Sequence, residues 1–359
     1  MPIQRESDAN NKREKKEDIN VVNERPVLGI TVGDPAGVGP EIVVKALSDP
    51  SIYRTARPLV YADGCVLTAA LDAAGVALAI REVGTPGEAK YEPGTIDYVG
   101  VGALTKTVPY GRISAEGGRA AFSYLDRAID AALSTEVDAL VTAPLNKESL
   151  KAAAVPYLDH TAMLDDRAAL RRTMTLFLVR KLKIFFLTRH LPFREIRGAI
   201  TREGIVQALP DCIACLRQLG VENPTIAVAG LNPHGGEHGL FGTEEMEVIG
   251  PAVEEARLLG YQVTGPIPAD AVFHLGLEGR YDAVLSLYHD QGHIAAKTVD
   301  FHGTVSLTMG LKFLRTSVDH GTAFDIAGKG IADARGMRNA ITAAGKYALG
   351  VKARLNLQE

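Results

Sequence analysis

The chain has 359 residues, of which 46% are hydrophobic and 23% charged, and its formal net charge is −4 at pH 7. This composition is that of an ordinary globular protein, and the length is sufficient for two domains. The slightly acidic balance argues against a nucleic-acid partner, and no apolar run is long enough to span a membrane. The polar N-terminus is unlike a signal peptide, and three cysteines do not indicate a disulfide framework, so we expect a cytoplasmic protein.

Residues 1–24 are polar and dense in charge, which predicts a flexible tail. After this tail, apolar runs typical of strands alternate with amphipathic helical patterns. The expected strands are Pro26–Val32, Pro58–Tyr61, Ala139–Thr142, Met174–Val179, Lys183–Thr188, Thr225–Ala229, Ala283–Leu287 and Thr304–Thr308. The expected helices include Glu41–Leu47, Val66–Ala74, Ala115–Leu133, Gly204–Leu219 and Glu244–Leu259. This alternation predicts a mostly parallel sheet covered by helices, with ligands bound beyond the carboxyl ends of the strands.

Two cysteines, Cys212 and Cys215, form a Cys-x-x-Cys pattern that is compatible with redox chemistry. They lie, however, in the expected helix Gly204–Leu219, whose apolar residues recur at helical spacing. Small, apolar cysteines on a buried helix face explain the pattern better.

A glycine-containing segment, Gly33–Glu41, follows the first expected strand and opens a helix, with Pro40 suited to the first helical position. It lacks the third glycine of the dinucleotide fingerprint and the Gly-Lys-Ser/Thr of a phosphate-binding loop. We therefore predict a tight strand–helix turn near the active cleft.

Three expected strands are each followed by a histidine: His190 after Lys183–Thr188, His234 after Thr225–Ala229, and His289 after Ala283–Leu287. If these strands are parallel neighbours, the three imidazoles arrive at one crevice and can bind a catalytic metal ion. Asp270 and Asp290 are candidate ligands or orienting carboxylates. The alternative is that each histidine is an ordinary loop or capping residue.

The segment Asp319–Asp333 is rich in glycine, which lets the backbone approach a ligand closely. An acidic side chain there can accept hydrogen bonds from ribose hydroxyls, which disfavours a 2′-phosphate. A solvated loop is the alternative explanation.

His320–Ala332 resembles the adenosine-binding segment of the β-decarboxylating dehydrogenases, the isopropylmalate and isocitrate dehydrogenase group. The rest of the chain is similar to the 4-hydroxythreonine-4-phosphate dehydrogenases of vitamin B6 synthesis. The matching motifs are Gly33–Glu41, Thr142–Lys147, His160-Thr161, Thr188–Pro192, Gly230–His234, Tyr288–Gly292 and Arg315–Ala323, in order from about Pro26 to the end.

The resemblance implies two α/β/α domains with mostly parallel sheets, as in isopropylmalate and isocitrate dehydrogenases, and an active site in the interdomain cleft. Residues 25–145 plus 300–359 would form the domain with the adenosine loop, and residues 146–299 the domain with the metal histidines. It also implies a homodimer whose active sites are shared between subunits, so that the histidine triad closes across two chains.

The same resemblance implies a role for individual residues. His190, His234 and His289 would bind one divalent metal ion, which could be zinc, magnesium, manganese or cobalt. A small anionic, phosphorylated substrate would be bound by His160, Thr161, Lys297, Ser306 and Arg315. NAD would be bound by Asp319, His320, Gly321, Thr322 and Asp325.

Three departures from the vitamin B6 enzymes concern the substrate. Ser306 stands where the family has asparagine, Asp159 where it has glycine, and His293-Ile294 where it has Leu-Pro. Similar Gly-His-Ile sequences occur in catabolic branches that oxidise 4-phospho-D-threonate, 4-phospho-D-erythronate or a terephthalate dihydrodiol.

The expected reaction is oxidation of a 3-hydroxy acid such as 4-phosphooxy-L-threonine by NAD, followed by β-decarboxylation. Lys147, or a water held by Asp270 or Asp290, would remove the hydroxyl proton. Two other classes remain open, a hydrolase with a three-histidine metal site and an inactive NAD-binding paralogue.

Overall fold

The computed structural model describes residues 25–357, so the tail predicted for residues 1–24 lies outside the described residues. One twelve-stranded sheet runs through this part of the chain in the order β3-β4-β2-β1-β5-β12-β11-β6-β7-β10-β8-β9. The strands are β1 Val27–Thr31, β2 Arg57–Ala62, β3 Ala79–Glu82, β4 Thr95–Gly100, β5 Ala139–Thr142, β6 Ala169–Val179, β7 Leu182–Phe186, β8 Ile226–Ala229, β9 Val263–Ile267, β10 Ala283–Ser286, β11 Val305–Leu311 and β12 Leu314–Val318.

The sheet has two parallel halves joined by an antiparallel centre. Strands β3, β4, β2, β1, β5 and β12 pair in parallel, as do β7, β10, β8 and β9. Between them, β12–β11, β11–β6 and β6–β7 pair antiparallel. Two-residue connections after β6 and β11 are too short for a crossover helix, so these neighbours must be antiparallel.

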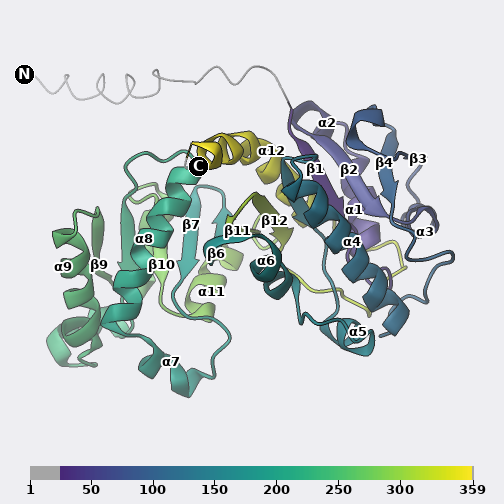
Figure 1. The fold of residues 1–359 in the computed structure, drawn as a ribbon. Coiled ribbons are helices and arrows are strands. Elements are labelled where there is room, and N and C mark those ends of the chain that lie inside the picture. Colours follow the sequence, from purple (N-terminus) through teal and green to yellow (C-terminus); the bar gives the residue numbers. More distant parts are fainter. Residues whose placement is uncertain (1–24, 358–359) are drawn as a thin grey trace, which may run out of the picture.

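Helices cover the sheet, and Figure 1 shows one group around β1–β4 and another around β7–β10. They are α1 Gly39–Leu47, α2 Ile52–Thr55, α3 Gly64–Ala74, α4 Ala115–Leu133, α5 Lys147–Ala152, α6 His160–Ala168, α7 Phe193–Ala199, α8 Arg202–Gln218, α9 Gly250–Leu258, α10 Ala269–Leu277, α11 His289–Val299 and α12 Arg335–Asn356. Helix α12 packs on β12 and also contacts α8, so it ties the two groups together. The mostly parallel, helix-covered sheet predicted from the sequence is confirmed.

Most of the expected elements are present with small changes at their ends, but four strands were missed: β3, β4, β9 and β12. The expected helix Glu244–Leu259 is also not uniform. It begins with a π-helical segment, Glu245–Ile249, and continues as α9.

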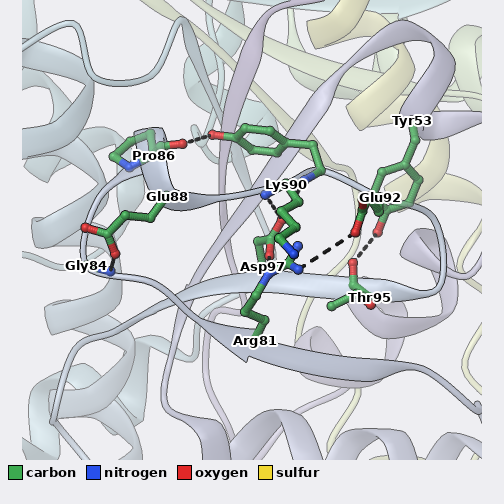
Figure 2. Close-up of polar contacts among 10 residues, drawn as sticks. Tyr53, Arg81, Gly84, Pro86, Glu88, Lys90, Glu92, Thr95 and Asp97 are labelled. Atoms are coloured by element: carbon green, nitrogen blue, oxygen red, sulfur yellow. Dashed lines mark hydrogen bonds and ion pairs between the residues drawn. The ribbon is translucent and has the colours of Figure 1, made fainter.

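Strands β3 and β4, which the sequence did not predict, form one edge of the sheet, and a buried carboxylate, Asp97 on β4, holds this edge. Its side chain accepts hydrogen bonds from Arg81 Nε at 2.6 Å and from the backbone N–H groups of Lys90 and Tyr91 at 3.0 and 2.7 Å (Figure 2). These contacts fasten the connection between β3 and β4 to the sheet.

Cys212 and Cys215 are fully buried in α8, and burial raises the pKa of both thiols. The interpretation as apolar core residues is confirmed. No helix among residues 25–357 is long and apolar enough to cross a membrane.

Candidate active site

The three strands that precede the candidate metal histidines are neighbours. Strand β10 pairs in parallel with β7 on one side and with β8 on the other, as the metal prediction required. Two side chains connect the ends of these strands. Thr188 Oγ1 donates to Leu287 O at 2.7 Å, and Gln291 Nε2 donates to Gly230 O at 2.8 Å.

Two of the histidines share a cavity of about 440 Å³. The ring centroids of His190 and His289 are 5.8 Å apart. Asp290 Oδ1 lies 2.6 Å from His289 Nδ1, which favours a proton on Nδ1 and leaves Nε2 free to bind a metal ion. The pKa of His190 is lowered by burial and by the neighbouring cations Arg189 and Lys147, so this imidazole is also held in the neutral, ligating form.

The third histidine, His234, does not line the cavity that His190 and His289 share. His234 lines a separate cavity of about 340 Å³ together with Asp270. Among residues 25–357, no three His, Cys, Asp or Glu side chains are close enough to hold a metal ion. The three imidazoles therefore do not form one ligand cluster within the described part of a single chain, and their common role as metal ligands stays a prediction. One chain presents two parts of a metal site, and a site completed by a second subunit stays a prediction.

Arg315, on β12, is a buried cation without an ion-pair partner among residues 25–357. Its guanidinium donates to Thr142 Oγ1 at 2.6 and 3.0 Å and to Thr308 Oγ1 at 3.1 Å. Burial lowers its pKa to about 10, which still leaves the group charged at neutral pH. The Asp159 carboxylate acts on it electrostatically but is paired with Lys147. A buried positive charge held by hydroxyls is suited to an anion.

His160 begins α6 beside this cation. Burial and the Arg315 charge lower the pKa of His160 well below its usual value, so the imidazole is neutral at pH 7. Asp159 caps the same helix by accepting from Ala162 N at 3.0 Å, and its carboxylate lies 3.2 Å from Lys147 Nζ. Burial raises the pKa of Asp159, but the Ala162 and Lys147 contacts outweigh this and lower it.

Other predicted substrate residues flank this region. Lys297, near the end of α11, lies 3.0 Å from the carboxylate of Asp319, a predicted cofactor residue. Ser306, on β11, is opposite Ser317 of β12. Thr161 follows His160 in the first turn of α6.

The predicted adenosine loop is anchored to the first strand–helix turn. Val38 N donates to Thr322 O at 2.9 Å, and a side chain at Gly37 would meet Thr322 Cβ at 2.9 Å. Buried Glu41 accepts from Ala332 N at 2.8 Å, which fastens the far end of the loop. The turn at Gly33–Glu41 thus supports the loop, as expected of a structural turn near the cleft. His320, Gly321 and Asp325 are exposed.

The sequence predicts no catalytic or binding role for three residues near the site. Asp159, a departure from the vitamin B6 enzymes, pairs with Lys147. His293 stacks on His289 with ring centroids 3.6 Å apart. Buried Glu245 contacts the turn before His234. Four-residue spacing on a helix could have placed His293 beside His289, but nothing in the sequence pairs Glu245 with a turn 13 residues away.

Residues 54–344 match the family model described as pyridoxal phosphate biosynthetic protein PdxA. Similar curated relatives are proteins named "putative D-threonate 4-phosphate dehydrogenase". The one from Symbiobacterium thermophilum is 50% identical and the one from Halalkalibacterium halodurans 51% identical; the alignments cover 90% and 91% of this chain and 97% and 98% of theirs.

Solved structures show the same fold. A 4-hydroxythreonine-4-phosphate dehydrogenase from Burkholderia phymatum is 42% identical with a TM-score of 0.80, covering 91% of this chain and 99% of that one. The enzyme of that name from Klebsiella pneumoniae is 38% identical with a TM-score of 0.83, covering 90% and 98%. A terephthalate 1,2-cis-dihydrodiol dehydrogenase from Burkholderia xenovorans is 27% identical with a TM-score of 0.59, covering 89% and 99%.

Proposed function

Because the chain belongs to the PdxA family of pyridoxal phosphate biosynthetic proteins and is a dehydrogenase, we propose that it oxidises a phosphorylated 3-hydroxy acid with NAD. The observation that carries this proposal is the buried, unpaired guanidinium of Arg315 beside neutral His160. A dianionic phosphate would give this charge the partner that it lacks among residues 25–357. Lys297 and Thr161 would complete the anion site.

A divalent metal ion fits the residues that one chain presents. His190 and His289 are close together, and the Asp290 contact orients the His289 ring, as is usual for ligating histidines. His234, with Asp270, would complete the site from the partner subunit of a homodimer. A bound metal ion would lower the pKa of the substrate hydroxyl and stabilise the charge that develops during β-decarboxylation.

The cofactor would bind along residues 319–325, which are anchored through Thr322 and end in exposed Asp325. The Asp325 carboxylate would accept hydrogen bonds from the adenosine ribose. Lys147, held by Asp159, is the first candidate for the base that removes the hydroxyl proton, with a water at Asp270 or Asp290 as the alternative.

We favour D-threonate 4-phosphate as the substrate over 4-phosphooxy-L-threonine. Several relatives named putative D-threonate 4-phosphate dehydrogenase are 47–51% identical to this chain. Three solved structures named as 4-hydroxythreonine-4-phosphate dehydrogenases are 36–42% identical to it. The residues that depart from the vitamin B6 enzymes support this choice: Asp159 pairs with Lys147, His293 stacks on His289, and Ser306 is opposite Ser317.

The deciding experiment follows NADH formation at 340 nm with purified protein. The substrates are D-threonate 4-phosphate, D-erythronate 4-phosphate, 4-phosphooxy-L-threonine and unphosphorylated D-threonate, each with NAD or NADP and with or without a chelator. We expect the highest kcat/KM with D-threonate 4-phosphate and NAD, and loss of activity with the chelator. Absence of NAD reduction with every phosphorylated substrate would refute the proposal, and full activity in metal-free protein would refute its metal-dependent part.

A further inference from the structure

The turn that carries His234 has an uncommon backbone conformation. Five consecutive residues, from His234 to His238, have positive φ angles of 52°, 69°, 81°, 45° and 55°. Three of them are not glycine, and L-residues avoid this left-handed region because Cβ approaches the backbone oxygen. Such a conformation persists only where surrounding contacts determine it.

The residues that enter this turn are held by Glu245, a residue that is only 4% exposed. Its Oε1 accepts from the backbone N–H groups of Leu231 and Asn232, each at 2.7 Å. Its Oε2 accepts from Asn232 Nδ2 at 2.8 Å. Both carboxylate oxygens therefore hold the two residues that enter the turn just before His234.

Glu245 and Asn232, the two residues of this contact, also leave no space for a side chain at Gly236 or Gly242. A Cβ on Gly236 would lie 2.8 Å from Glu245 Oε2, and a Cβ on Gly242 would lie 2.5 Å from Asn232 Nδ2. Glu245 opens the π-helical segment Glu245–Ile249, a conformation that is often found at functional sites.

The hydrogen bonds between Glu245 and Asn232, called the clamp below, also extend to the loop of a second candidate ligand, His190. Asn232 Nδ2 donates to Glu244 Oε2 at 2.7 Å, and Glu244 is ion-paired with Arg197 of α7. Helix α7 begins three residues after His190. A continuous set of polar contacts thus connects the turns that follow β7 and β8.

We propose that Glu245 is the positioning residue for His234: its buried carboxylate holds the left-handed turn and so sets the direction in which this imidazole is presented to a divalent metal ion. This inference rests on the proposed metal-binding role of His234. A carboxylate is required because all three groups that contact it are hydrogen-bond donors. A glutamine of the same shape would turn its own N–H₂ donor toward one of these donors and lose that hydrogen bond.

The test compares zinc affinity of the purified full-length protein by competition with a chromophoric chelator, together with kcat and KM. We expect Glu245→Gln to weaken zinc binding by about tenfold to a hundredfold, as loss of a residue that orients a ligand usually does. At saturating zinc, kcat should recover toward the wild-type value with KM for the substrate unchanged. Glu247→Gln is the matched control, because it makes the same change at an exposed position of the same segment and should bind zinc like wild type.

Wild-type zinc affinity in folded Glu245→Gln would overturn the inference. If Glu245→Gln does not fold, Asn232→Ala decides, because it removes only the side-chain half of the clamp; unchanged zinc affinity in that variant would overturn the inference too. The variant His234→Ala distinguishes the metal-binding role of His234 from the positioning role of Glu245. If it binds zinc as tightly as wild type, the proposed role of His234 fails, whereas loss of zinc in His234→Ala without loss in the clamp variants refutes only the positioning role.

Discussion

At the scale of single residues, Arg315 shows how a buried charge can be hydrogen-bonded and still lack a counter-charge among residues 25–357. Its guanidinium is held by Thr142 and Thr308, on the strands that flank β12. These hydroxyls satisfy donors without neutralising the charge, so the electrostatic benefit of a bound phosphate remains available.

We predict that Arg315→Lys raises KM for the phosphorylated substrate by about tenfold to a hundredfold, since lost hydrogen bonds to a charged group cost roughly 1.5–3 kcal/mol. Lysine keeps the charge but not the planar fork of donors. Steady-state kinetics would measure this, with Arg54→Lys at an exposed position of α2 as the control. An unchanged KM in folded Arg315→Lys would exclude Arg315 from phosphate binding.

His160 gives a prediction on stability and pH. Burial and Arg315 place its pKa in the folded protein below its unfolded value near 6.5, so below pH 6.5 the unfolded chain binds the additional proton. The free energy of unfolding should therefore fall as pH drops from about 6.5 toward the lowered folded pKa, by at most about 1.4 kcal/mol per pH unit for this one group.

In His160→Gln this loss should be smaller, and the remaining slope would come from His190 and His293, whose pKa values burial also lowers. Urea unfolding at pH 7.5, 6.5 and 5.5 measures the slopes. Equal slopes in the variant and the wild type would contradict a neutral His160 in the folded protein.

At the scale of elements, the strands that the sequence predicted are those with unbroken apolar runs, such as β1 and β10. Strand β12 was missed because Arg315, Thr316 and Ser317 look polar, although contacts with neighbouring strands and with α12 satisfy them. Pairing of polar groups between distant segments leaves no local pattern. For the same reason the sequence placed His234 after β8 but could not show the left-handed turn in which it lies.

The edge formed by β3 and β4 depends on Asp97, which receives three hydrogen bonds (Figure 2). We predict that Asp97→Asn lowers the free energy of unfolding by about 2–4 kcal/mol, because buried donors lose a charged acceptor. Urea denaturation would measure this change. Glu92→Gln should change stability by less than about 0.5 kcal/mol, because Glu92 lies 3.8 Å from Arg81 and is 63% exposed. Similar effects of the two substitutions would contradict this role of Asp97.

The loop at 319–325 gives a prediction on cofactor choice. A 2′-phosphate near exposed Asp325 would meet like charge, which after screening costs on the order of 1–3 kcal/mol. We expect Asp325→Ala to narrow the NAD/NADP ratio of kcat/KM, chiefly by weakening NAD. Kinetics with both cofactors, with Glu222→Ala as a surface control, would test this. An unchanged ratio would show that Asp325 is not the discriminator.

At the scale of the whole molecule, the candidate site joins both halves of the sheet. Lys147, which follows β5, helps to lower the pKa of His190, which follows β7. Asp319, after β12, pairs with Lys297 of α11. The predicted division into residues 25–145 plus 300–359 and residues 146–299, with a cleft between them, is compatible with these contacts and stays a prediction.

A subunit-mixing experiment tests whether the site is shared in a homodimer. Because His190 and His289 occupy one cavity and His234 another, we expect His234 to reach the partner's His190 and His289 cavity. After subunit exchange between inactive His190→Ala and His234→Ala proteins, half of the dimers would be mixed. Each mixed dimer would contain one site without a substitution and one site with both substitutions. Activity should recover to about a quarter of the wild-type value, as two-fold symmetry requires.

Mixing His289→Ala with His234→Ala should give the same recovery. Mixing His190→Ala with His289→Ala should give none, because these two histidines belong to one subunit's contribution and every site would lack one of them. Native mass spectrometry would verify the subunit exchange. Recovery in the His190–His289 mixture, or no recovery in either mixture with His234→Ala, would show that the histidines are divided between the subunits in another way or are not shared at all.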